Sequence, residues 1–232
     1  MPTENRVRTY AVAELDRLAT DYLAQHFGPD VLIPVDVDLL VEKAEGITLD
    51  VWPKLQANHK VLGMVLRDVG SGELFIHIDE DLADNDTPNG LARYRMTVAE
   101  ELAHIRLHRP LIAAIQGPDD FRKLHSHSQW TEIERNAKKF AAMLLMPTQP
   151  LMVEAREVYH QITGQPQIRE QLIKSISASK RWEPHIKKRL DIEMAKRFEV
   201  SEMAMHYRLE EWPAEVYKHV ERALESGSDT LL

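Results

Sequence analysis

Glu100, Glu101 and His104 are the residues whose types and spacing are best suited to chemistry. In the sequence Glu-Glu-Leu-Ala-His, the first and fifth side chains can hold a metal ion and the second can serve as a general base. Residues four apart lie on the same face of a helix, so Glu100 and His104 can converge on one ion. Glu101 points about a quarter turn away, toward the water that would attack a substrate. The cluster predicts metal-assisted hydrolysis.

A metal site of this kind needs a third protein ligand. Glu134 is the candidate, because it lies on the next strongly apolar helix, and two packed antiparallel helices would bring its carboxylate within reach of His104. His108 stands eight residues after Glu100, a separation of roughly 12 Å along a helix, so we expect it to pack beside the site and not to bind the same ion. By itself, Glu-Glu-x-x-His also occurs by chance in solvated helices, where Glu101 would be a surface carboxylate.

Two amphipathic helices are predicted to position these side chains. In Leu91–His108, apolar residues recur at intervals of three and four, and Arg109 and Pro110 end the pattern. Thr131–Leu145 has the same spacing and ends before Pro147. The cleft that carries the chemistry is expected between the two helices.

Shorter patterns around these helices predict an α+β fold. A helix is expected at Ala11–Phe27, ended by Gly28 and Pro29. Runs of β-branched and apolar residues then predict a small antiparallel sheet whose last two strands form a hairpin. The expected strands are Ile47–Trp52, Val61–Leu66 and Glu73–Ile78. Residues 79–90 are expected to form a loop, and the chain beyond about Thr148 is mostly helical in pattern.

The composition restricts the metal ligands that the chain can offer and indicates its cellular compartment. The 232 residues include no cysteine, so His, Asp and Glu are the metal ligands that the chain offers. A formal charge of -8 argues against nucleic acid binding over the whole molecular surface. No stretch is apolar enough for a membrane span or a signal peptide, which predicts a cytoplasmic protein without a membrane partner.

Three stretches, in order, resemble the ImmA/IrrE family of metallo-endopeptidases. Arg95–His104 reads RMTVAEELAH, similar to the family's stretch around His-Glu-x-x-His. Ile133–Pro147 reads IERNAKKFAAMLLMP and looks like the third-ligand helix with its Leu-Leu-Met-Pro ending. Ala195–Leu209 reads AKRFEVSEMAMHYRL and is similar to the family's helix-turn-helix-like segment. The resemblance implies a zincin-like metallopeptidase domain at residues 1–147 and a helical C-terminal module at 148–232.

The resemblance also implies a function and roles for the residues. The chain would be a metal-dependent endopeptidase, with Glu101 as the catalytic base and Glu100, His104 and Glu134 as ligands of one divalent ion, zinc in most of the family. Its substrate would be a specific protein, a helix-turn-helix transcriptional repressor of a mobile element or a stress regulon.

Two positions depart from the family pattern. Glu100 stands where the first His is usual, and Lys138 stands where Asp or Asn is usual, four residues after Glu134. Two carboxylates and one imidazole make a harder, more negative ligand set, which favours manganese or iron over zinc. Lys138 can pair with Glu100 or Glu134, or its ammonium can take the place of the ion. In the last case the chain would be an inactive pseudopeptidase that regulates a partner by binding it.

The segment Lys187–Arg197 is more basic than the rest of the chain and, with the turn and helix that follow, resembles a DNA-reading unit. Acidic residues are interleaved with it, at Glu193, Glu202 and Glu210. Direct DNA binding is therefore less expected than a surface for a protein partner. His125 and His127, between the two site helices, are expected to be solvated.

Overall fold

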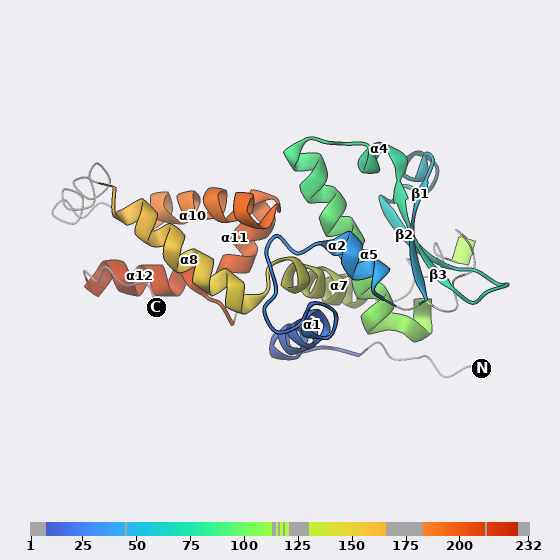
Figure 1. Ribbon diagram of the computed structural model, residues 1–232, viewed down its shortest axis with the longest axis horizontal. Coiled ribbons are helices and arrows are strands. Elements are labelled where there is room, and N and C mark those ends of the chain that lie inside the picture. Colours follow the sequence, from blue (N-terminus) through green and yellow to red (C-terminus); the bar gives the residue numbers. More distant parts are fainter. Residues whose placement is uncertain are drawn as a thin grey trace. The chain divides into compact units, whose positions relative to one another are not determined.

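The computed structural model describes residues 8–44, 46–112, 115, 117, 119–120, 130–165, 183–211 and 213–226 (Figure 1). The chain divides into two compact units. The first holds the described residues as far as Leu145, and the second those from Met146 onward together with Leu32–Pro34. All of the predicted site residues belong to the first unit.

The first unit begins with two helices whose ends follow from their sequences. Helix α1 (Val12–Phe27) buries Leu15 and Leu23 on one face and ends at Gly28, whose φ of 86° suits glycine. Helix α2 (Val37–Glu42) starts at Asp36, whose carboxylate accepts a hydrogen bond from the Leu39 N–H at 2.9 Å.

A three-stranded mixed sheet follows, in the order β1-β3-β2. Its strands are β1 (Ile47–Trp52), β2 (Gly63–Arg67) and β3 (Leu74–Asp79). The predicted β2–β3 hairpin is confirmed, but the prediction of an antiparallel sheet is wrong for β1, which pairs parallel with β3. The reason is that β3 lies in the centre, and β1 joins its other edge after a crossover through helix α3 (Leu55–His59) and β2.

The long helix α5 (Pro88–Ile112) carries the predicted site and follows the short helix α4 (Glu80–Ala83). Both helices use residues of the expected loop at 79–90: α4 lies within it, and α5 starts at Pro88, because proline suits a first helical turn. The backbone of α5 leaves helical geometry at His108 (φ −125°, ψ 24°). Two hydrogen bonds tie α5 to the segment around α2: Arg95 Nη2 donates to the Val35 carbonyl at 2.9 Å, and Tyr94 donates to Asp38 at 3.0 Å.

Helix α7 (Trp130–Leu145) packs along α5 and against α1. Its apolar face, which includes Ile133, Ala137 and Phe140, is fully buried, as the spacing of these residues predicted. Helix α5 also packs on β2 and β3. The sheet and α7 therefore hold the site helix from two sides.

The described part of the second unit consists of helices and their connections (Figure 1). The helices are α8 (Thr148–Thr163), α10 (Glu183–Phe198), α11 (Glu202–Glu210) and α12 (Val216–Ser226). The chain is thus an α+β protein with a helical C-terminal region. Whether residues 148–232 fold as an independent module stays a prediction.

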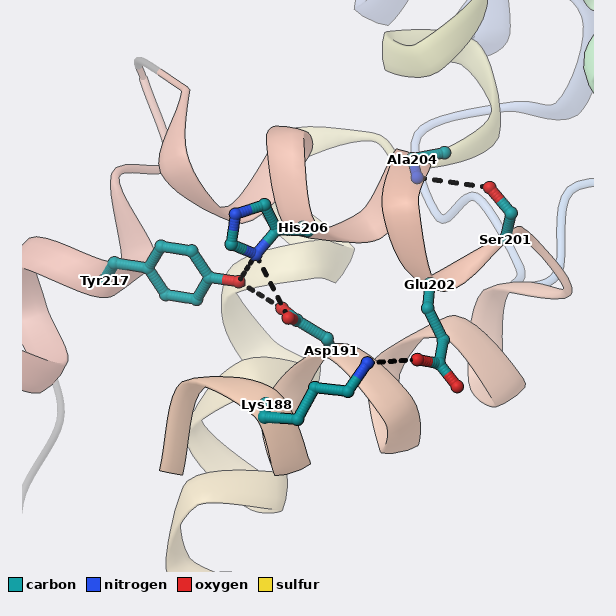
Figure 2. Close-up of polar contacts among 7 residues, drawn as sticks. All are labelled: Lys188, Asp191, Ser201, Glu202, Ala204, His206 and Tyr217. Atoms are coloured by element: carbon teal, nitrogen blue, oxygen red, sulfur yellow. Dashed lines mark hydrogen bonds and ion pairs between the residues drawn. The ribbon is translucent and has the colours of Figure 1, made fainter. Parts of the chain in front are cut away.

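Polar contacts fix the turn between α10 and α11 (Figure 2). Ser201 caps α11 by accepting a hydrogen bond from the Ala204 N–H at 3.1 Å. Asp191, only 4% exposed, bonds the Tyr217 hydroxyl and lies 3.0 Å from Nδ1 of His206. These contacts join α10, α11 and α12, as expected of a packing unit.

Candidate metal and catalytic site

Helices α5 and α7 bring His104 and Glu134 into direct contact. Nε2 of His104 lies 3.1 Å from Oε1 of Glu134, and the His104 side chain is 8% exposed. Burial by itself would lower the pKa of His104, but the hydrogen bond that its ring donates to Glu134 and the negative charges of Glu101, Glu134 and Glu100 outweigh burial and raise the pKa. In turn, His104 and the nearby Lys138 outweigh the burial of Glu134 and lower its pKa.

Lys138 is bound to the same carboxylate. Its Nζ lies 3.4 Å from Oε2 of Glu134, one helical turn away, and its side chain is 59% exposed. Of the two carboxylate partners expected for Lys138, the ion pair is with Glu134. Burial raises the pKa of Glu100, one turn before His104 on α5, although the charges of Lys138 and His104 oppose the shift.

The donors fit a divalent ion at two of the three predicted positions. Two ligands of one tetrahedral ion, each about 2.0–2.1 Å from it, lie about 3.3 Å apart, close to the separation of the His104 and Glu134 atoms. Glu100 does not complete a group, since no set of three His, Asp or Glu side chains that could hold a metal ion occurs among the residues that the structure describes. As a side chain with three rotatable bonds, Glu100 is the candidate for the third position.

Glu101, on α5, lies in close contact with strand β2. A Cβ atom added at Gly63 would lie 2.8 Å from both Cγ and Oε1 of Glu101 and 2.7 Å from Cγ2 of Thr97, so glycine is required there. Glu101 is 9% exposed. Burial raises its pKa to about 7, and the charges of Glu100 and Glu134 act in the same direction while His104 opposes them. A carboxyl group with this pKa can take up and return a proton near neutral pH.

His108 lies beside the site, with its ring centroid 5.8 Å from that of His104. It is 3% exposed, and neither ring nitrogen has a hydrogen-bond partner within the described part of the chain. Burial, with the charge of His104, lowers the pKa of His108 to about 4, so its ring is neutral at pH 7. This arrangement is that of a packing residue.

A cavity of about 320 Å³ opens onto Glu100, Glu101, His104 and Glu134. Sequence reasoning missed several of its other lining residues. Trp130 stacks on His104 with ring centroids 6.0 Å apart and an interplanar angle of 9°. Gly63, with the residues just before it, and Arg93 also line the cavity. A Trp at the start of a helix and a Gly at the start of a strand carry no local signal of a site. His125 and His127 lie outside the described residues.

Residues 75–210, more than half of the chain, match a family of peptidases described as IrrE N-terminal-like domain. The chain belongs to this family. The match spans β3, both site helices and α11, and it agrees with the resemblance seen in the sequence. The family supports a metallopeptidase-type function, and the α+β architecture fits a zincin-like fold.

No curated protein matches the chain. Within the described residues, no helix combines the length and the apolar character that crossing a membrane requires.

Proposed function

We propose that the chain is a metal-dependent endopeptidase that cuts a specific protein. The observation that carries the proposal is the 3.1 Å contact between His104 and Glu134 in a cavity that the largely buried Glu101 also lines. This is an imidazole and a carboxylate that can share an ion, next to a group suited to moving a proton.

Each residue has a defined part in the proposed reaction. His104 and Glu134 bind the ion, and Glu100 supplies the third ligand. A divalent ion, when bound, supplies Lewis acidity toward the carbonyl of the peptide bond. Glu101 takes a proton from the attacking water and returns it to the leaving amine, and its contact with Gly63 keeps the carboxylate oriented.

The ligand set bears on which ion is bound. Two carboxylates and one imidazole favour manganese or iron over zinc, the usual metal of the family. Lys138 makes the site less negative while it pairs with Glu134. Because its side chain is largely exposed, it can move into solvent when an ion neutralises Glu134.

The proposed substrate is a helix-turn-helix transcriptional repressor, the class that the family resemblance implies, and the reaction would take place in the cytoplasm. The test incubates the purified chain with manganese or zinc and the repressor encoded beside it, and mass spectrometry identifies the products. We expect one cleavage that Glu101→Gln and Glu134→Gln both abolish.

Glu132→Gln is the matched control. Glu132 lies two residues before Glu134 on α7, and it pairs with Arg135 at the surface, outside the cavity. It should cut as fast as the wild type. Cleavage that persists in Glu101→Gln, or no cleavage with any divalent metal, would contradict the proposal.

A second candidate is a pseudopeptidase that binds its partner without cutting it. The contact of Lys138 with Glu134 favours it, because an ammonium at 3.4 Å can substitute for a metal cation. In this case the partner would bind equally well to the wild type and to Glu101→Gln, and a chelator would leave the thermal stability of the chain unchanged. A fall in the melting temperature on chelation would exclude it.

A further inference from the structure

A second cavity in the first unit lies on a different face of the site helix. Its volume is about 500 Å³, within the range of about 300–1,000 Å³ that small-molecule sites occupy. Leu102 and Ile105 of α5 contribute buried surface to it, as does Tyr22 of α1. On a helix, positions 102, 105, 106 and 109 share a face that differs from the face of Glu101 and His104. The cavity is therefore separate from the peptidase site.

Three cations surround this cavity, and they come from two different elements. Lys43 follows helix α2, and Arg106 and Arg109 lie on α5. None of the lining residues that the structure describes is acidic. Within the described part of the chain, no carboxylate forms an ion pair with any of the three. In a protein with a formal charge of -8, a group of unpaired cations around one hollow needs an explanation.

Two of the cations are held in place by other contacts. Nζ of Lys43 donates to the carbonyl oxygen of His26 at 2.9 Å and lies 4.9 Å from the ring centroid of Phe27. The guanidinium of Arg106 lies 5.2 Å from the ring centroid of Tyr22. These contacts hold the two charges in place, and neither involves a carboxylate of the described residues.

The electrostatic effect of this arrangement appears at His26, which also lines the cavity. Burial lowers the pKa of His26, and the charges of Arg106 and Lys43 lower it further. The cavity thus has a positive potential that disfavours another cation and favours an anion.

We propose that this cavity binds a small phosphorylated ligand with at least two negative charges. Arginine and lysine side chains are the groups that recognise phosphate oxygens, arginine in a bidentate manner. The size of the cavity, which is open to solvent and bordered by two helices and the end of a third, suits a metabolite better than a polymer. This binding does not depend on peptidase activity.

The test uses inorganic pyrophosphate as the probe, titrated calorimetrically into the full metal-free chain at low salt. We expect one site whose affinity falls as salt rises, and at least about tenfold weaker binding for Arg106→Gln and for Arg109→Gln. Arg17→Gln is the matched control, because it removes the same charge from the exposed face of α1, where Arg17 is 67% exposed. It should bind pyrophosphate like the wild type.

Two further measurements locate the ligand. Bound pyrophosphate should raise the pKa of His26 in an NMR titration, because it offsets the charges of Arg106 and Lys43. Lys138→Gln, which removes the cation beside the metal site, should bind pyrophosphate as the wild type does; loss of binding there would assign the anion to the metal site and overturn the proposal. It would equally be overturned by no measurable binding, by an equal loss in Arg17→Gln, or by tighter binding of an oligo-aspartate peptide than of pyrophosphate.

Discussion

Substitution of Gly63 by alanine tests the close approach of strand β2 to the catalytic carboxylate. The added methyl group would lie 2.7 Å from Cγ2 of Thr97 and 2.8 Å from Oε1 of Glu101, whereas ordinary contact begins at 3.4 Å. The side chains of Thr97 and Glu101, or the helix that carries them, must therefore move away from the strand by about 0.6–0.7 Å. Thr97 and Glu101 both lie on the buried face of α5, so neither side chain can simply turn into solvent.

Overpacking of a buried position by one methyl group typically costs about 1–3 kcal/mol. We expect the free energy of unfolding of Gly63→Ala to fall by about this amount in a urea titration. A displacement approaching 1 Å at a catalytic group can lower the rate about 100-fold, so cleavage should suffer more than stability.

Gly70→Ala is the control within the same hairpin. A Cβ there meets only Oδ1 of Asp68 at 3.4 Å, so we expect stability equal to the wild type or slightly higher. Thr97→Ser should recover part of the lost stability when combined with Gly63→Ala, because it removes the methyl group at 2.7 Å. If Gly63→Ala unfolds at the same urea concentration as the wild type, the described packing of β2 against α5 is refuted.

Three other perturbations have defined outcomes. Lys138→Gln should change the free energy of unfolding by less than about 1 kcal/mol, because the ion pair is exposed. It should strengthen manganese binding about tenfold or more in calorimetry, and weaker binding would mean that Lys138 supports the ion. The pKa of His108 is lower in the folded than in the unfolded protein, so protonation favours unfolding. The metal-free protein should lose up to about 3 kcal/mol of stability as the pH falls from about 6.5 to about 4. His108→Leu should lose less, and acid titrations monitored by circular dichroism measure the difference. Arg208, 1% exposed, donates to Thr148 at 2.6 Å and to the Met146 carbonyl, so Arg208→Leu should lower the free energy of unfolding by about 2–3 kcal/mol in urea; an unchanged midpoint would contradict these contacts.

Local patterns were sufficient to predict the helices that position the site. The three-to-four spacing of apolar residues predicted α1, α5 and α7 to within a few residues, because each helix buries one face. The β2–β3 hairpin was predictable for a different local reason, because its turn is short and rich in glycine. The identity of the family followed from motifs that lie on these elements.

Features that depend on contacts between distant segments could not be predicted. The parallel pairing of β1 with β3 requires a crossover, and nothing in either strand specifies it. Gly63 and Trp130 reach the cavity only through tertiary packing. For Lys138 the sequence left two partners open: Glu134 lies one turn away on the same helix, whereas Glu100 could be reached only through the packing of α5 on α7.

The metal content of the chain tests the central claim most directly. The wild type and His104→Gln are saturated with manganese or zinc, freed of unbound ion by gel filtration, and measured by inductively coupled plasma mass spectrometry. We predict about one ion per chain in the wild type and none above background in His104→Gln. A wild type that retains no ion, or two proteins that retain the same amount, would contradict the claim that His104 and Glu134 hold a metal.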